Sequence, residues 1–68
     1  MQTKINTDQV KRLRMGRALT QAELAELAGV DTKTIEHAEL GWPLKPATIK
    51  GIAAALGLEP EEITCVVD

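Results

Sequence analysis

Residues 20–41 constrain the fold of this chain more than any other stretch of its sequence. Thr20, followed three residues later by Glu23, matches a capping box. In this motif each side chain accepts a hydrogen bond from the backbone N–H of the other residue at the start of a helix. Gly29 interrupts the apolar spacing, and glycine ends a helix in a left-handed conformation without steric cost. Ile35 then resumes an apolar stripe. The stretch therefore predicts two short helices joined by a tight turn at Gly29.

The residues around this turn indicate how the two helices pack. Leu24, Leu27 and Ala28 are expected to line the inward face of the first helix. Ala25 is small, which suits a close crossing of helix axes about 8–10 Å apart. Asp31 is placed to cap the second helix. Two helices, a glycine turn and a small crossing residue together make a helix-turn-helix unit.

The rest of the chain predicts further short helices around this unit. We expect a helix capped by Thr7 and ending near Gly16, one over residues 47–56 preceded by Pro46, and a short one from Glu59 to Ile63. Residues 1–6 are interpreted as a loose lead-in, and residues 65–68 remain unassigned. Apolar residues make up 44% of the chain, and strand-like alternation is almost absent. The expected fold is all-α: one domain over residues 1–68, with a core of about 7–63, formed by a compact bundle of four to five short helices.

The composition argues against an enzyme, a metal site and a membrane protein. Cys65 is the only cysteine, so neither an internal disulfide nor a four-ligand zinc site is expected. The single histidine, His37, lies in a different element, and no glycine-rich phosphate loop or nucleophile motif is present. No apolar run approaches the roughly 18 residues of a membrane span, and the first ten residues lack a signal-peptide core. We expect a cytoplasmic protein with no cofactor, no metal and no membrane contact.

Charge is distributed unevenly along the chain. The net charge is −2, but the first 58 residues hold eight basic and six acidic groups, whereas the last ten hold four acidic groups and no basic one. The local field at a contact surface, rather than the sum, decides what binds there. Lys11, Arg12 and Arg17 are interpreted as a solvated face, with flanking phosphate contacts as the alternative. A polyanionic partner therefore remains compatible with the sequence.

Several segments together resemble a known family. They are VKRLR at 10–14, TQAELAELAGV at 20–30, TIEHAELG at 34–41, Pro46, and IAAALGLEPEEI at 52–63. In this order they resemble the phage-repressor and Cro-type (xenobiotic-response-element-like) helix-turn-helix transcription regulators. The resemblance covers nearly the whole chain. It implies five helices, with the third helix in the major groove of double-stranded DNA and a dimer that reads two half-sites.

The resemblance also implies roles for individual residues outside the third helix. Thr20, Gln21 and Lys45 match positions at or beside phosphate contacts. The free backbone amides at a helix N-terminus attract anions, which suits the place of Gln21. Arg14 and Glu39 match a pair that often forms an ion pair between the first and third helices. That pair is interpreted as structural.

Four residues occupy the exposed positions of the predicted reading helix: Thr32, Lys33, Glu36 and His37. Lys33 can donate to guanine, Thr32 can contact a thymine methyl group, and Glu36 can accept from cytosine. His37 can donate to a base or to a phosphate. The alternative is that these side chains form an ordinary solvated helix face.

The sequence thus predicts a sequence-specific double-stranded DNA binder, a repressor or a small controller protein that acts as a homodimer. The expected dimer surface is the apolar C-terminal segment, with Leu58, Ile63, Val66 and Val67. The alternative function is a protein-interaction or antitoxin-like adaptor module on the same fold. The acidic tail, together with Leu40 and Trp42 where a DNA contact would favour basic residues, motivates this alternative. Trp42 itself is expected to cover the core or, failing that, to be an exposed anchor.

Overall fold

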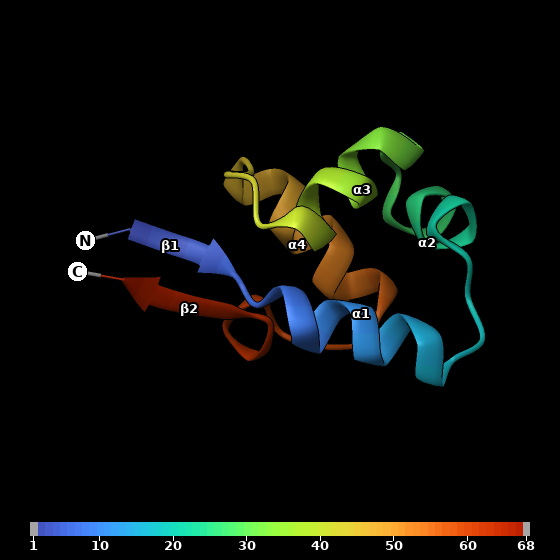
Figure 1. The fold of residues 1–68 in the computed structure, drawn as a ribbon, viewed down its shortest axis with the longest axis horizontal. Helices are drawn as coiled ribbons and strands as arrows, with labels where there is room; N and C mark the ends of the chain where they lie inside the picture. The colour runs from blue at the N-terminus through green and yellow to red at the C-terminus, as the bar shows by residue number, and fades with distance from the viewer. Residues whose placement is uncertain (1, 68) are drawn as a thin grey trace.

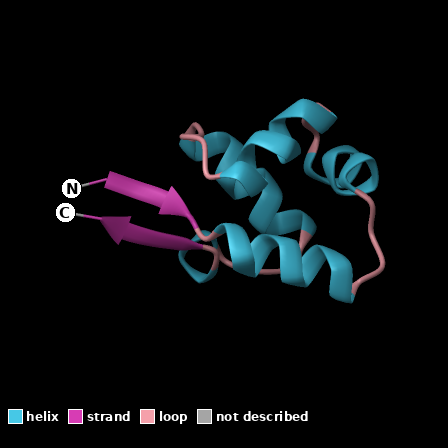
Figure 2. Ribbon diagram, viewed as in Figure 1, coloured by secondary structure: helices cyan, strands magenta, loops and turns pink. Residues whose placement is uncertain are grey.

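Helices form the body of the molecule, and a small two-stranded ribbon extends from one end of it (Figures 1 and 2). The structure is a computed structural model that describes the backbone of residues 2–67 and the side chains of residues 5–64. Its elements are β1 (Gln2–Ile5), α1 (Thr7–Gly16), α2 (Gln21–Ala28), α3 (Thr32–Leu40), α4 (Pro46–Ala55), the 3-10 turn η1 (Pro60–Glu62) and β2 (Thr64–Val67). The predicted all-α bundle of four to five short helices is confirmed. Within residues 2–67 no helix combines the length and apolarity needed to cross a bilayer.

Residues 2–5 pair with residues 64–67, so the prediction of a loose lead-in is wrong, and residues 65–67, which the sequence does not assign to an element, form part of a strand. Strands β1 and β2 are antiparallel, with Gln2 opposite Val67 and Ile5 opposite Thr64. An isolated two-stranded ribbon is marginal in water. Here Ile5 is buried, and the backbone N–H of Asn6 donates to the carbonyl of Ile63 at 2.6 Å. These contacts anchor the ribbon to the helices.

Helix α1 is capped by Asn6 and not, as predicted, by Thr7. The Oδ1 atom of Asn6 accepts from the backbone N–H of Gln9 at 3.1 Å. Both residue types are good caps, and the one whose backbone is extended takes the role. Asn6 has that conformation (φ −82°, ψ 97°), whereas Thr7 is the first helical residue. The helix ends at Gly16 as predicted.

Arg17 serves the fold at the junction between two helix ends. Its guanidinium donates to the carbonyl of Leu56, beside the end of α4, at 2.8 Å and to the carbonyl of Leu13 at 3.3 Å. Carbonyls at helix C-termini lack intrahelical partners and favour cations. Arg17 is exposed, as expected for a solvated face, and it also ties the ends of α1 and α4 together.

Ala18, in the turn between α1 and α2, has a left-handed backbone with φ of +54°. The left-handed conformation costs an L-residue with a Cβ atom about 1–2 kcal/mol, and it costs glycine nothing. We expect Ala18→Gly to raise the free energy of unfolding by roughly 0.5–1 kcal/mol, because the looser unfolded chain offsets part of the gain. Urea denaturation followed by circular dichroism measures this. The matched control is Ala54→Gly within α4, where the same change should lower stability by about 0.5–1 kcal/mol. A loss at both positions would contradict the prediction.

The core is aliphatic and draws on β1, on all four helices and on the residue that precedes β2. The buried residues are Ile5, Val10, Leu24, Ala25, Ile35, Ala38, Ile49, Ile52, Ala53, Leu56 and Ile63. Ala25 and Ile35 thus lie in the core where the sequence placed them. Ile63 is fully buried, so it cannot line a dimer surface, contrary to the prediction. Its side chain fills the space between the helices and the base of the ribbon.

The helix-turn-helix unit consists of α2, the turn at Gly29 and α3. Gly29 is left-handed (φ +73°), as predicted, and the backbone N–H of Val30 donates to the carbonyl of Ala25 at 3.0 Å. Two details differ from prediction. Asp31 stands at the N-cap position of α3, but its side chain makes no capping hydrogen bond. Leu27 is 61% exposed, because the buried face of α2 is centred on Leu24 and Ala25.

Helix α4 approaches the end of α2 closely at Gly51. A Cβ atom placed on Gly51 would lie 2.8 Å from the carbonyl oxygen of Ala28. Real Cβ atoms essentially never come that near to a backbone oxygen. The absence of a side chain at position 51 therefore allows the close approach of α2 and α4, which local sequence signals do not predict.

Candidate nucleic-acid interface

Helix α3 lies on the outside of the helical body (Figure 1). Thr32, Lys33 and Glu36 are exposed, whereas Ile35 and Ala38 are fully buried. With 3.6 residues per turn, the three polar residues fall on one side of the helix and the buried pair on the other. The structure thus brings these three predicted base-reading residues together on one accessible surface.

The fourth predicted base-reading residue, His37, is half-buried and packs against Trp42. Their ring centroids are 4.1 Å apart and the ring planes differ by 10°, so the rings are stacked. Trp42 is 55% exposed. The prediction that it covers the core is therefore wrong, and the alternative of an exposed residue is favoured. Instead of covering the core, the indole covers one face of the His37 ring, at the C-terminal end of α3.

The end of α3 brings about this stack. Gly41 is left-handed (φ +86°), and the backbone N–H of Trp42 donates to the carbonyl of His37 at 3.0 Å. In this type of helix ending, the second residue after the helix often contacts the side chain five positions earlier. The Gly-Trp pair after an amphipathic helix was the sequence signal for this contact. The stack itself was not predicted.

The N-terminus of α2 forms the second part of the candidate interface. The Oγ1 atom of Thr20 accepts from the backbone N–H of Glu23 at 3.0 Å, and Oε1 of Glu23 accepts from the backbone N–H of Thr20 at 2.9 Å. The predicted capping box is therefore present. A hydroxyl has one donor and two acceptor sites, so this cap leaves the hydroxyl hydrogen of Thr20 for another acceptor.

Behind this surface, Arg14 and Glu39 form a nearly buried ion pair. Nε of Arg14 donates to Oε2 of Glu39 at 2.7 Å, and Nη2 donates to Oε1 at 3.1 Å. The side chains are only 13% and 7% exposed. The hydrogen bonds with Glu39 raise the pKa of Arg14 above its ordinary value, against the opposing effect of burial. The ion pair therefore stabilises the charged form of the guanidinium.

Two further contacts extend this ion pair to α2. Nη1 of Arg14 donates to the carbonyl of Leu19 at 2.8 Å, just before α2 begins. The amide Nε2 of Gln21 approaches Oε1 of Glu39 at 3.4 Å. The sequence predicted the pair but not the participation of Gln21. The cluster of Arg14, Glu39, Leu19 and Gln21 holds α1, the start of α2 and α3 in a fixed relation.

Lys45 stands apart from these groups in sequence, at the end of the loop that follows α3. It is exposed and occupies the N-cap position of α4, where its side chain makes no capping hydrogen bond. Pro46 follows as the first helical residue, so α4 begins one position earlier than predicted. The ammonium group of Lys45 is therefore accessible to an anion.

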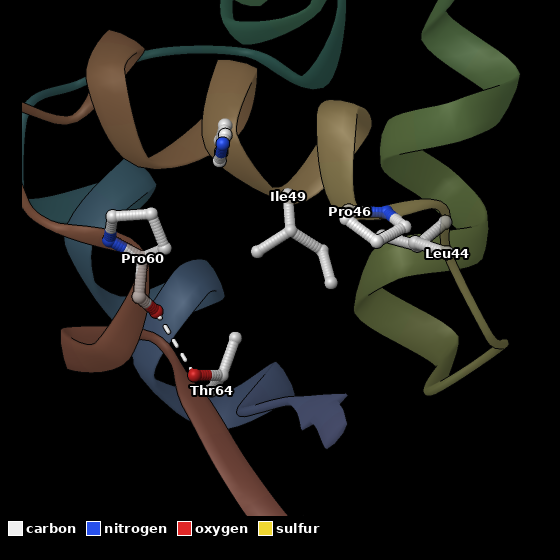
Figure 3. A pocket seen from close by; sticks show the side chains of 6 residues that line it. Leu44, Pro46, Ile49, Pro60 and Thr64 are labelled. Carbon is white, nitrogen blue, oxygen red and sulfur yellow. Dashed lines mark hydrogen bonds between the residues drawn. The ribbon is translucent and has the colours of Figure 1, made fainter. Parts of the chain in front are cut away.

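A separate hollow of about 230 Å³ lies between α4 and the start of β2 (Figure 3). It is lined by Leu44, Pro46, Ile49, Lys50, Pro60 and Thr64. The hydroxyl of Thr64 donates to the carbonyl of Pro60 at 3.0 Å, and Lys50 is the only ionisable residue of the lining. This apolar hollow has neither the charge of a nucleic-acid site nor an acid–base pair. Among the described residues, no cluster of His, Cys, Asp and Glu is arranged to hold a metal ion.

Comparison with known proteins relates this geometry to other chains. Residues 7–64 match the family model of a helix-turn-helix domain. The crystal structure of the restriction-modification controller protein C.AhdI from Aeromonas hydrophila is similar, with a TM-score of 0.77 and 32% identity over 82% of this chain and 86% of that one. The hypothetical transcription factor NHTF from Neisseria has a TM-score of 0.75 and 26% identity over 82% of this chain and 64% of that one. The comparison with curated proteins returns no match.

Proposed function

This chain belongs to the helix-turn-helix domain family, and we propose that it is a transcription regulator that reads a specific double-stranded DNA sequence with α3 in the major groove. The observation that carries the proposal is the exposed polar face of α3, which lies opposite the buried Ile35 and Ala38. The regulator class is supported by the similarity to a restriction-modification controller protein and to a hypothetical transcription factor.

In this proposal, Thr20, Gln21 and Lys45 position the protein on the DNA backbone. Thr20 keeps a hydroxyl hydrogen to donate to a phosphate oxygen after serving as the cap of α2. Gln21 has two amide hydrogens, and Glu39 engages only one of them. Contacts of this kind set register and orientation without carrying sequence information.

Thr32, Lys33, Glu36 and His37 then read base edges. Lys33 donates to the acceptors of guanine, and Thr32 contacts the thymine methyl group or donates its hydroxyl. Glu36 accepts from cytosine, and its charge discriminates against any approach that brings it to a phosphate. His37 donates from a ring nitrogen at the far end of the same helix. The face therefore reads bases over the length of α3.

We further propose that the protein acts as a homodimer, because one module of this size meets few base pairs. The two half-sites would lie about 34 Å apart, one helical turn of DNA. With Ile63 buried, the proposed surface reduces to the half-buried Leu58 and to strand β2, which carries Val66 and Val67. The side chains of Val66 and Val67 lie outside the described residues. Sedimentation equilibrium tests the assembly, and a monomer at high concentration would contradict it.

Replacing Lys33 by alanine tests the base-reading role. A duplex is first selected from a random pool at low salt, and its affinity is followed by fluorescence anisotropy. We expect Lys33→Ala to cost about 1–3 kcal/mol on the selected duplex and less on a scrambled one. Affinity should fall with salt at a slope of about −0.9 per phosphate neutralised.

Lys50→Ala is the matched control, because Lys50 is an exposed lysine that lines the apolar hollow on α4. It should leave the affinity for both duplexes nearly unchanged. An equal loss on both duplexes from Lys33→Ala would make Lys33 a phosphate contact. A pool without any enriched duplex would overturn the DNA-binding proposal itself.

The second candidate function is a protein-interaction or antitoxin-like adaptor module. The observation that favours it is the exposure of two large apolar residues at the end of α3, with Leu40 at 69% and Trp42 at 55%. Exposed apolar patches mark interaction sites on small soluble domains. An absence of enriched DNA, together with a loss of partner binding in Leu40→Ala, would favour this function.

A further inference from the structure

We propose that Trp42 is a positioning residue for base reading. It holds the imidazole of His37 in one orientation at the C-terminal end of α3, so that this ring is ordered before DNA arrives. The inference rests on the proposed function and adds to it a residue that the analysis of the sequence did not place at the interface. It assigns Trp42 a role through His37 and not through a contact of its own with DNA.

The geometry of the stack supports this role. The rings are nearly parallel, with 10° between their planes and 4.1 Å between their centroids. A parallel stack occupies a ring face, whereas the nitrogen atoms of an imidazole lie on its edge. The contact with Trp42 therefore restricts the rotation of the His37 ring and leaves its hydrogen-bonding edge uncovered by the indole.

The backbone places Trp42 for this contact. Gly41 takes the left-handed conformation, and the backbone N–H of Trp42 is bonded to the carbonyl of His37 itself at 3.0 Å. The main-chain hydrogen bond thus fixes the two residues that the side-chain stack joins. Since the helix ending already orders the backbone at Trp42, the stack requires only the ordering of two side chains.

An ordered His37 lowers the entropy lost on binding. Immobilising a free side chain at an interface weakens association by an amount that corresponds to about 3- to 10-fold in affinity. A side chain already held in its binding orientation avoids that loss. Trp42 is also more than half exposed at the end of the same helix, so a direct contact with DNA is the outcome that the experiment must separate.

The stack is tested first in the free protein by fluorescence. Trp42 is the only tryptophan, and the chain has no tyrosine or phenylalanine, so the emission comes from Trp42 alone. Exposing the indole face that His37 covers should shift the emission of His37→Ala to longer wavelength. The control is Glu36→Ala, which changes the exposed neighbour on the same helix and should leave the emission unchanged. An unchanged emission in His37→Ala would overturn the inference.

The role in DNA binding is tested with a double-mutant cycle on the selected duplex. We expect Trp42→Ala to lower affinity about 3- to 10-fold in the wild-type background and to have no effect when His37→Ala is already present. Trp42→Phe, which restores an aromatic face, should recover most of the affinity. The slope of affinity against salt should be the same with and without Trp42, because no phosphate contact is removed.

Thermal unfolding by circular dichroism establishes that every variant is folded at the assay temperature. Equal losses from Trp42→Ala in both backgrounds would mean that Trp42 contacts DNA directly, which overturns the positioning role while the DNA-binding proposal stands. A pool without an enriched duplex overturns the DNA-binding proposal, and the positioning role with it, whatever the emission spectra show.

Discussion

Replacing Glu39 by alanine is expected to lower the free energy of unfolding by about 3 kcal/mol. Arg14 and Glu39 are 13% and 7% exposed, so the change leaves a nearly buried guanidinium with the carbonyl of Leu19 as its remaining partner. Stranding one charge of a buried pair typically costs about 3–5 kcal/mol. A domain of this size has roughly 5 kcal/mol in total. Urea denaturation followed by circular dichroism should show most of that stability lost.

Two further variants separate the loss of the buried ion pair from the loss of an ordinary glutamate. Glu26→Ala changes an exposed glutamate of α2 and should alter stability by no more than about 0.5 kcal/mol. The double replacement Arg14→Met with Glu39→Met removes both charges, so it should cost clearly less than the sum of the single replacements. A Glu39→Ala variant as stable as Glu26→Ala would show that the pair contributes nothing.

The same substitution is expected to act with opposite sign at two helical glycines. Gly51→Ala should lower the free energy of unfolding by roughly 1–3 kcal/mol, because its Cβ would lie 2.8 Å from the Ala28 carbonyl. The contacted atom is backbone, so α2 or α4 must shift. Gly16→Ala should instead raise stability by about 0.5–1 kcal/mol, since nothing lies within 4 Å of the added methyl group and alanine is the better helix former.

The pair of variants forms its own control, because both glycines lie in helices and both changes add one methyl group. Urea denaturation of the two proteins under identical conditions gives the comparison. Helix propensity alone predicts that both variants gain stability, whereas the close approach of α4 to α2 predicts a gain at Gly16 and a loss at Gly51. Stabilisation at both positions would contradict the packing described for Gly51.

Local signals in the sequence were sufficient to locate most helix ends. Thr20 with Glu23, and the left-handed glycines at 29 and 41, act within a few residues of where they stand, so their effects can be predicted without knowing the fold. The exposed face of α3 follows from the same short-range periodicity. These features supply the helix-turn-helix unit and three of the predicted base-reading positions.

Features that depend on distant parts of the chain could not be predicted in this way. Each strand of the ribbon has only four residues, and its partner lies at the other end of the sequence. Arg17 acquires its role only because the end of α4 lies beside it. Ile63 appeared to be an apolar residue without a use until the helices were seen to enclose it. The ribbon, the contacts of Arg17 and the burial of Ile63 all depend on tertiary contacts.

The ribbon also has a consequence for how the molecule assembles. Its ladder joins Gln2 to Val67, so its closure encloses the whole described chain in a single loop. The entropy lost on closing a loop grows with its length, whereas each helix needs only neighbours in sequence. We therefore expect the helices to come together before the two ends of the chain pair. We expect the ribbon to separate first on unfolding, and removing either strand would leave the other without its hydrogen-bonding partner.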